Sequence, residues 1–264
     1  MMDTDAIITE ISGAISSARQ IEAFSKRGFE LSSDAAYKIA AKVRANFDPS
    51  PLIGRKIGFT NRGIWDKYCV DQPIWGDISA ASVTYHEDGQ ATLDLGSFCE
   101  PRIEPEVVIC LKSAPTLKSN KNSVDACIHW VAPGFEIVDS IYPGWSFSLA
   151  DSIATGGLHR CLLIGKRVAA NEDIERYLLD LKVGLFKDGI LREVGSGANV
   201  LDGPVSAVRY LMEGLEHYDD QRPLSSGDII TTGTMTDAKP IRAGEHWSAK
   251  YSGVINSSFS VKCK

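Results

Sequence analysis

The sequence predicts a mixed α+β protein with a helical N-terminal region, and three observations indicate this fold class. The first ~47 residues repeat apolar side chains at helical spacing. Most of the chain after them consists of short extended runs separated by turn residues. These runs do not alternate regularly with helices, as they would in a βαβ protein. We therefore expect a helical region over residues 1–48 and a rolled or sandwiched mixed β-sheet over residues 49–264.

Two helices are expected in the N-terminal region. The first is marked by apolar residues at helical spacing, which are Ile7, Ile8, Ile11, Ala14 and Ile15. The second has the sequence SSDAAYKIAAKVRANF, in which Ser32 or Ser33 can serve as the N-cap. The following DPSPL stretch ends this helix, because proline and the residue before it disfavour the α conformation. A boundary between the two regions is therefore expected near residues 48–52.

The rest of the chain is read mainly as strands. The expected strands are GRKIGFT, ASVTYH, ATLDLG, EVVICL, CLLIG, LKVGLFKDG, GDIITTG, HWSAKYSG and VINSSFSVK. The KDG and SGD tripeptides within this region are turn signals. Helices are expected at about residues 121–131, 171–179 and 204–217, the last with Pro204 in its first turn.

Composition excludes several classes of function. The 264 residues are 44% hydrophobic and 23% charged, as in an ordinary globular protein. The net charge of −6 argues against a general nucleic-acid binder, which presents a basic patch. No apolar run approaches the roughly 20 residues that span a bilayer, and the N-terminus lacks the basic start of a secretory signal. The six cysteines form no C-x-x-C pair, so we expect reduced thiols and a cytoplasmic protein.

The stretch EPRIEPEVVICL places two glutamates on one face of an expected strand. Side chains alternate along a strand, so Glu104 and Glu106 point the same way, whereas the apolar residues Ile103, Val107, Ile109 and Leu111 point the other way. Such a pair often lies simply on a solvated face. Alternatively, the two carboxylates bind a divalent cation, because hard cations prefer carboxylate oxygens. The spacing alone leaves both interpretations open.

Three further residues have side chains suited to chemistry. Glu136 lies in the apolar stretch GFEIV, where a carboxylate needs either an arginine partner or a shared metal. Lys56, in GRKIGFT, is either the polar side of a strand or a group that transfers protons to a substrate. His159, in GGLHRCLLIG, is either a structural histidine or a general acid or base.

The glycine-rich stretches do not indicate a nucleotide site. GSGANVLDGP and ITTGTMTDAKP match neither a P-loop nor a G-x-G-x-x-G fingerprint. Gly195 and Gly197 instead fit a tight turn or a close approach of the backbone to a ligand. We predict that Gly197 and Thr236, one from each stretch, bind the substrate. There is also no G-x-S-x-G motif that would indicate a covalent nucleophile.

Seven blocks, taken in order, resemble one enzyme family. They are KIGFT, VDQPIWG, PRIEPEV, FEIVDS, CLLIG, GSGANVLDGP and LSSGDIITTGTMTDAKPIRAGE. Together they resemble the 2-oxopent-4-enoate hydratase and 4-oxalocrotonate decarboxylase branch of the fumarylacetoacetate hydrolase superfamily. The resemblance runs from about residue 50 to the C-terminus. It implies the mixed β-fold of that superfamily and a lyase, dependent on Mg²⁺ or Mn²⁺, that acts on 2-oxo or 2-hydroxydienoic acids in aromatic catabolism.

The resemblance also implies roles for individual residues. Glu104 and Glu106 match the metal-binding Glu-x-Glu of the family, Glu136 matches its third metal ligand, and Lys56 matches its active-site lysine. A 2-oxo acid can chelate such a metal through its carboxylate and its C2 oxygen, so the cation would stabilise an enolate. Water can then add at C4, or a vinylogous carboxylate can leave as CO₂.

The chain departs from this pattern at two positions. Hydratases of the branch resemble one another in having an aspartate directly after the proline of the D-Q-P block. This chain has Ile74 there, and an apolar residue at this position looks more like the decarboxylases. Asp71, before that proline, is retained as a catalytic candidate or a turn residue. His159 stands where a small hydroxyl residue is expected, and we predict that it replaces the missing acid or base.

These observations lead to an ordered set of expected functions. The first is a metal-dependent hydratase of 2-hydroxy-2,4-dienoates, and the second is a 4-oxalocrotonate-type decarboxylase or an acylpyruvate hydrolase of the same superfamily. A third, from another class, is a non-catalytic protein that binds a metal or a 2-oxo acid. The expected partner is a small-molecule substrate, with no nucleic acid or membrane, and the resemblance implies a homo-oligomer.

Overall fold

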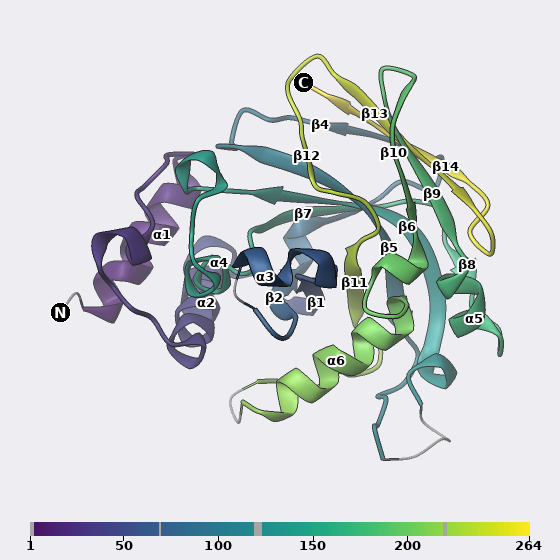
Figure 1. Ribbon diagram of the computed structural model, residues 1–264, viewed down its shortest axis with the longest axis horizontal. Helices are drawn as coiled ribbons and strands as arrows, with labels where there is room; N and C mark the ends of the chain where they lie inside the picture. Colours follow the sequence, from purple (N-terminus) through teal and green to yellow (C-terminus); the bar gives the residue numbers. More distant parts are fainter. Residues whose placement is uncertain (1–2, 69, 119–122, 219–220) are drawn as a thin grey trace.

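The computed structural model describes residues 3–68, 70–118, 123–218 and 221–264 and confirms the expected mixed α+β fold (Figure 1). Its helices are α1 (Thr4–Ser16), α2 (Ser33–Phe47), α3 (Trp65–Tyr68), α4 (Leu149–Ala154), α5 (Ile174–Leu179) and α6 (Pro204–Glu216). None of the described helices combines the length and the apolar composition that crossing a bilayer requires.

The strands form two sheets. The larger has the order β2-β1-β11-β5-β6-β7-β3, with β12 beside β5 and β8 beside β6, and the smaller has the order β10-β9-β13-β14-β4. Their bounds are β1 (Leu52–Gly58), β2 (Ile74–Ser79), β3 (Val83–Tyr85), β4 (Gln90–Leu93), β5 (Pro101–Leu111), β6 (Ile128–Asp139), β7 (His159–Ile164), β8 (Val168–Ala169), β9 (Lys182–Lys187), β10 (Ile190–Ser196), β11 (Ile229–Thr234), β12 (Lys239–Pro240), β13 (His246–Ser252) and β14 (Ser258–Cys263).

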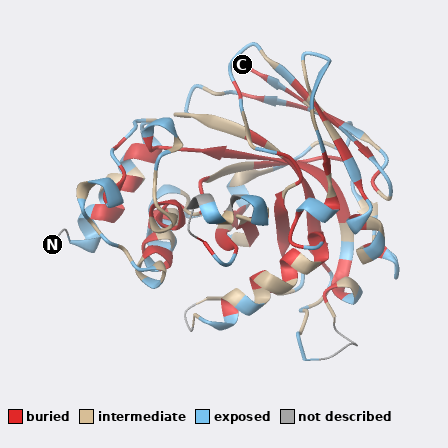
Figure 2. Cartoon of the chain, viewed as in Figure 1, coloured by how far each residue is buried: buried red, intermediate tan, exposed pale blue. Residues whose placement is uncertain are grey.

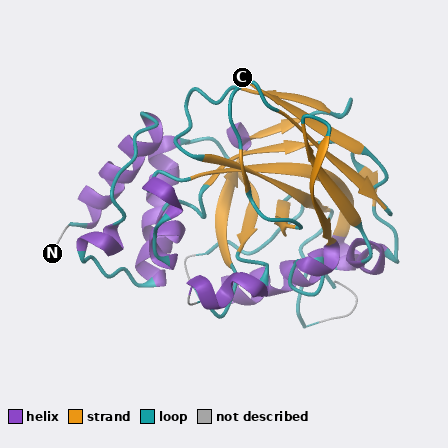
Figure 3. Ribbon diagram, turned by 45° about the horizontal axis from the view of Figure 1, so that its top comes forward, coloured by secondary structure: helices purple, strands orange, loops and turns teal. Residues whose placement is uncertain are grey.

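The N-terminal helices form as expected. The apolar stripe of α1 is buried, and the hydroxyl of Ser32 caps α2 by accepting a hydrogen bond from the backbone N–H of Ala35 at 3.2 Å. Helix α2 ends at Phe47, directly before the Asp48-Pro49 pair. Figures 1 and 3 show both helices at one end of the molecule, beside the sheets. Their buried residues belong to the same hydrophobic cluster as the main sheet, and the domain boundary near residue 48 stays a prediction.

Strands β5 and β6 lie at the centre of the large sheet. They pair antiparallel over nearly their whole length, from Pro101 opposite Asp139 to Leu111 opposite Ile128. Both strands are almost entirely buried, as the red ribbons of Figure 2 show. Tyr251 of β13 donates its hydroxyl to backbone carbonyls of both strands and so joins the two sheets behind them.

One helix prediction was wrong. The stretch at 121–131 contains only a short 3₁₀ turn at Asp125–Cys127 in its described part, and the chain enters β6 at Ile128. Pairing with β5 on one side and with β8 on the other decides the conformation here, over the local helical pattern. The other two predictions are confirmed, since α5 and α6 lie within the expected ranges and Pro204 opens α6.

Candidate metal centre and substrate cavity

Three carboxylates meet at the junction of β5 and β6. Glu104 lies directly opposite Glu136 in the antiparallel register, so both side chains point to the same side of the sheet. Glu106, two residues along β5, shares that side as the alternation predicted. One carboxylate oxygen from each residue lies within 4.8 Å of the other two. The opposite face of β5 carries the expected core residues, which are Ile103, Val107, Ile109 and Leu111.

The carboxylates are crowded and poorly solvated. Glu106 and Glu136 are fully buried, and Glu104 is partly exposed. Burial raises the pKa of Glu104 to about 7, with repulsion from Glu136 adding to the rise and Lys56 opposing it. Burial and the two neighbouring carboxylates raise the pKa of Glu106 well above its ordinary value. Without a cation, the site therefore favours protons on these two residues.

The pKa of Glu136 is shifted in the opposite direction, because two donors contact one of its oxygens. The Lys56 ammonium lies 3.1 Å from Oε1, and the Nδ1 of His159 lies 2.8 Å from the same atom. Burial alone would raise the pKa of Glu136, but Lys56 and His159 lower it to about 2. The hydroxyl of Thr231 is 3.5 Å from Oε2, so this second oxygen is the less engaged one.

Lys56 is itself buried, with 3% of its surface exposed. Its Nζ also donates a hydrogen bond to the backbone oxygen of Gly157 at 3.1 Å. Burial acts to lower its pKa, but the carboxylates around it, with Glu136 foremost, raise that pKa above the ordinary value. Lys56 is therefore a fixed cation beside the carboxylates.

A divalent cation fits this donor set. Oε2 of Glu106 accepts a hydrogen bond from the backbone N–H of Gly233 at 2.9 Å, whereas its buried Oε1 has no hydrogen-bond partner among the described residues. A buried carboxylate oxygen without a donor is costly. A hard cation between the three carboxylates would engage that oxygen and offset their repulsion. Mg²⁺ and Mn²⁺ both prefer such oxygen ligands.

A cavity of about 570 Å³ opens beside the carboxylates. Its chemistry-bearing lining includes Lys56, Glu104, Glu106, Arg102 and Thr236. Apolar walls are contributed by Ile57, Phe59, Ile74, Val138, Trp145, Phe147 and Leu158. A cavity of this size with a few convergent polar groups is typical of a small-molecule site. The structure thus brings Lys56, two of the three predicted ligands and Thr236 to one substrate-sized space.

Three other candidates lie elsewhere. Asp71 is exposed and is not part of the cavity lining. Gly197 is buried against the backbone near α5, where an added Cβ would meet the oxygen of Leu178 at 1.8 Å. His159 contacts Glu136 but lines a second cavity, separate from this one. The need for glycine at 197 is therefore explained by packing of the chain against itself, and the roles assigned to Asp71 and Gly197 gain no support from their positions.

Sequence reasoning missed two contributors to the site. Gly233 supplies the N–H that binds Glu106, and its φ of +101° lies in the region that favours glycine. Arg102 lines the cavity, with its guanidinium 3.9 Å from the centre of the Trp145 ring. The strand alternation that paired Glu104 with Glu106 also places Arg102 on the same side, so this residue was accessible to the same argument.

Comparison with known proteins gives a consistent group of relatives. No family model matches the chain. A 2-hydroxyhexa-2,4-dienoate hydratase of Comamonas testosteroni is 27% identical over 246 residues, which cover 91% of this chain and 90% of the relative. A 4-oxalocrotonate decarboxylase of Pseudomonas putida is 29% identical over 229 residues, which cover 85% and 84%.

Solved structures agree with this group. The 4-oxalocrotonate decarboxylase from Pseudomonas putida G7, complexed with magnesium and adipate, superposes with a TM-score of 0.88 at 25% identity, covering 99% of this chain and 97% of that one. A fumarylpyruvate hydrolase from Pseudomonas aeruginosa, in complex with Mn²⁺ and pyruvate, shares the fold alone, with a TM-score of 0.58 at 13% identity over 81% of this chain and 90% of that one. The resemblance to the hydratase and decarboxylase branch, predicted from the seven sequence blocks, is confirmed.

Proposed function

We propose that this chain is a divalent-metal-dependent lyase that hydrates 2-hydroxy-2,4-dienoates of the 2-oxopent-4-enoate type to 4-hydroxy-2-oxo acids. The observation that carries the proposal is the carboxylate trio with its unpartnered Glu106 oxygen, next to Lys56 and a substrate-sized cavity. The names of the hydratase relatives supply the substrate class.

Glu104, Glu106 and Glu136 would hold the metal, for which we propose Mg²⁺ or Mn²⁺. A cation bound there would supply a Lewis acid that polarises a 2-oxo acid and stabilises negative charge at its C2 oxygen. Lys56 and His159 keep Glu136 ionised and hold its Oε1, which leaves Oε2 for the metal.

Lys56 is the proposed proton-transfer group. Its Nζ lines the cavity while being fixed by Glu136 and by the carbonyl of Gly157. Such fixing orients the ammonium toward one position on a bound substrate, which is what general acid and base catalysis requires. Thr236 donates its hydroxyl to the backbone oxygen of Asp237 at 3.2 Å, so its oxygen remains an acceptor for a substrate hydroxyl.

His159 acts on the substrate only through Glu136. Because it lies outside the substrate cavity, we assign it a positioning role in place of direct acid or base chemistry. Its Nδ1 fixes Glu136, and its Nε2 lies 3.0 Å from the hydroxyl of Ser82, which holds the ring in place.

Decarboxylation of a 4-oxalocrotonate-type acid is the second candidate. The favouring observation is Ile74, which is 3% exposed and lines the cavity where an aspartate is expected in a hydratase. An apolar wall there removes a group that would bind or activate water. The similarity to a decarboxylase structure over nearly the whole chain supports the same candidate.

One experiment separates these candidates. The purified protein, with Mg²⁺ or with excess chelator, is mixed with 2-hydroxypenta-2,4-dienoate and separately with 4-oxalocrotonate, while ultraviolet loss and released CO₂ are followed. Metal-dependent loss of the dienoate without CO₂ establishes the hydratase. Release of CO₂ from 4-oxalocrotonate establishes the decarboxylase. Inactivity on both, when the protein binds Mg²⁺, contradicts the proposed lyase and leaves the acylpyruvate hydrolase and the non-catalytic binding protein.

Matched variants link the activity to the site. Glu106→Gln removes a carboxylate charge from the trio at nearly constant shape, and Glu216→Gln makes the same change at an exposed position at the end of α6. We expect activity to be lost in the first variant and retained in the second. We also propose that the chain forms a homo-oligomer, which light scattering on the purified protein tests directly.

A further inference from the structure

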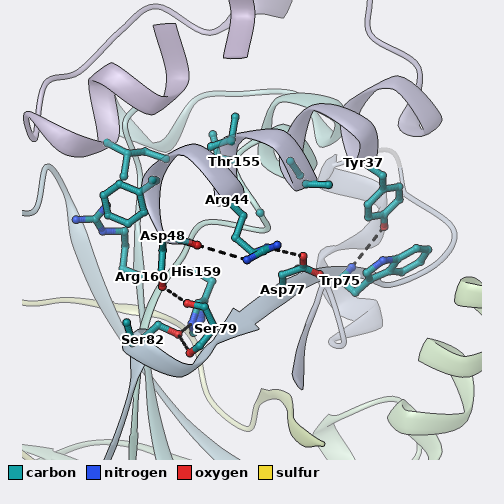
Figure 4. A pocket seen from close by; sticks show the side chains of 18 of the residues that line it. Tyr37, Arg44, Asp48, Trp75, Asp77, Ser79, Ser82, Thr155, His159 and Arg160 are labelled. Carbon is teal, nitrogen blue, oxygen red and sulfur yellow. Dashed lines mark hydrogen bonds and ion pairs between the residues drawn. The ribbon is translucent and has the colours of Figure 1, made fainter. Parts of the chain in front are cut away.

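A second cavity, of about 410 Å³, lies between α2 and β2 (Figure 4). Its aromatic walls are Tyr37, Phe47, Trp75 and Phe98. The chain segment at 155–160 separates it from the substrate cavity, because Gly156 and His159 line the second cavity whereas Gly157 and Leu158 line the first. The two cavities therefore lie on either side of this segment.

Arg160 is a cation without a counter-charge in this second cavity. Its Nη2 donates to the backbone oxygen of Ser97 at 3.0 Å, and its Nη1 is buried and has no hydrogen-bond partner among the described residues. No carboxylate of the described residues lies within 4.0 Å of it. Burial lowers the pKa of Arg160, and the more distant Asp139 offsets this only in part. An anion near this guanidinium would thus be stabilised.

The other acidic and basic side chains that line the cavity have polar partners of their own. Nε of Arg44 lies 3.0 Å from the carboxylate of Asp77. The carboxylate of Asp48 accepts hydrogen bonds from the hydroxyl of Ser79 and the backbone N–H of Ser50. Figure 4 shows the contacts of Arg44 with Asp77 and of Asp48 with Ser79 along the wall formed by α2 and β2. An incoming anion would therefore meet Arg160 as its partner.

Aromatic rings surround the same guanidinium. Its carbon lies 4.9 Å from the centre of the Phe47 ring and 5.3 Å from the centre of the Phe98 ring. Phe47 is 41% exposed, so the aromatic wall reaches the surface and a ligand can enter along it. Exposed aromatic surface beside a cation favours a ligand that is both flat and anionic.

We infer that this second cavity is a ligand site, separate from the substrate cavity, for a small aromatic carboxylate. The carboxylate pairs with the Arg160 guanidinium, whose planar fork matches two carboxylate oxygens. The ring packs against Phe47 and Phe98. The volume of about 410 Å³ is in the range of small-ligand pockets and suits a one-ring acid.

A ligand here would also affect the metal centre. His159 lines the second cavity and contacts Ser82 there, and its other ring nitrogen holds Glu136 at 2.8 Å. Displacement of the ring by a bound acid changes how Glu136 is held. Because coupling between two sites is reciprocal, a metal and the acid then alter each other's affinity by the same factor.

Benzoate is the probe, and its binding is measured by calorimetry with excess chelator, so that no metal in the substrate cavity can bind it. We expect saturable binding of benzoate to the wild type and little binding of neutral benzamide. Arg160→Gln should weaken the binding of benzoate by about tenfold or more, and Phe98→Leu should weaken this binding less. Arg167→Gln, which changes an exposed arginine elsewhere, is the matched control and should bind as the wild type does.

Two results would overturn the site: no binding at about 10 mM benzoate, far above useful affinity, or equal binding by the wild type and by both cavity variants. Thermal unfolding of each variant verifies that it is folded. If Arg160→Gln does not fold, Phe98→Leu still tests the site. Because no turnover is measured, failure here leaves the proposed lyase untouched. The coupling is tested by the dissociation constant of Mg²⁺ with and without saturating benzoate, and equal values would exclude it.

Discussion

Replacement of Glu104 by glutamine should stabilise the metal-free protein while weakening its affinity for metal. The glutamine keeps the shape of the side chain but removes one of three crowded negative charges. In the absence of a cation, that charge is unfavourable, because burial and Glu136 oppose it more than Lys56 favours it. In the presence of a cation, the same charge would act as a ligand under the proposed function. Glu104→Gln therefore has opposite effects in the two conditions: it favours the metal-free fold and disfavours the metal-bound one.

The magnitude follows from the pKa of Glu104, which rises from 4.5 to about 7. Each pH unit of such a rise corresponds to about 1.4 kcal/mol, so ionised Glu104 costs the metal-free fold about 3 kcal/mol. Solvent reaches part of this side chain, which reduces the expected gain of Glu104→Gln to between about 1 and 3 kcal/mol at pH 8.

The size of this gain in stability depends on pH within a definite window. Below pH 4.5, Glu104 is protonated in both the folded and the unfolded chain and contributes nothing. As the pH rises from 4.5 to about 7, the unfolded chain loses a proton that the folded chain keeps, so stability falls. The gain from Glu104→Gln should therefore be absent at pH 4 and complete at pH 8. Glu136 has the opposite behaviour, since its pKa of about 2 stabilises the fold above pH 4.5 and that contribution is lost only in acid.

Urea unfolding at pH 4 and pH 8, with chelator or with saturating Mg²⁺, measures these effects. With chelator at pH 8, the variant should be more stable than the wild type. With Mg²⁺, the wild type should gain stability that the variant does not. Glu216→Gln, at an exposed position, should change nothing in either condition. A variant that is less stable than the wild type in chelator at pH 8 would refute the reasoning from crowded charges.

Three further substitutions test the surroundings of the site. Lys56→Met removes the ammonium 3.1 Å from Glu136 and should lower turnover of the dienoate by about 100-fold or more, seen as the initial rate of ultraviolet loss; near-normal rates would remove Lys56 from the mechanism. Tyr251→Phe removes a hydroxyl that binds two buried carbonyl oxygens and should cost about 1 to 3 kcal/mol in urea unfolding, and an unchanged midpoint would show that water replaces it. Gly76→Ala places a Cβ 2.1 Å from the backbone oxygen of Gly156 and should cost about 2 kcal/mol or more, and a neutral effect would show that this wall yields.

The sequence was most informative where local periodicity determines geometry. Alternation along one strand placed Glu104 and Glu106 on a common face, and the structure agrees because β5 is regular there. Glu136 lies 30 residues beyond Glu106 in the chain, and only the pairing register of β5 with β6 brings it opposite Glu104. Local pattern contains no information on that register, so the residues left a shared metal as one of two interpretations of Glu136, and the family resemblance decided between them.

Other features depend on tertiary arrangement and were out of reach. The beginning of β6 was read as part of a helix, because the local pattern does not reveal its pairing with β5 and β8. His159 lines the second cavity and not the substrate cavity, and this depends on how the segment at 155–160 is placed between the two cavities in the fold. Thr236 reaches the cavity, but Asp71 and Gly197 do not, although all three were chosen from similar turn-like stretches.

The charges around the metal centre also indicate why a divalent cation suits it. The three carboxylates and the Lys56 ammonium sum to −3 + 1 = −2 when all are ionised. A divalent cation brings this sum to zero in a site where two of the three carboxylates are buried from water. A monovalent cation would leave one uncompensated charge, which a buried environment penalises heavily. When no cation is bound, protons on Glu104 and Glu106 serve the same purpose, as their raised pKa values indicate. Lys56 therefore offsets one of the three negative charges and so influences the charge of the ion that would balance the site.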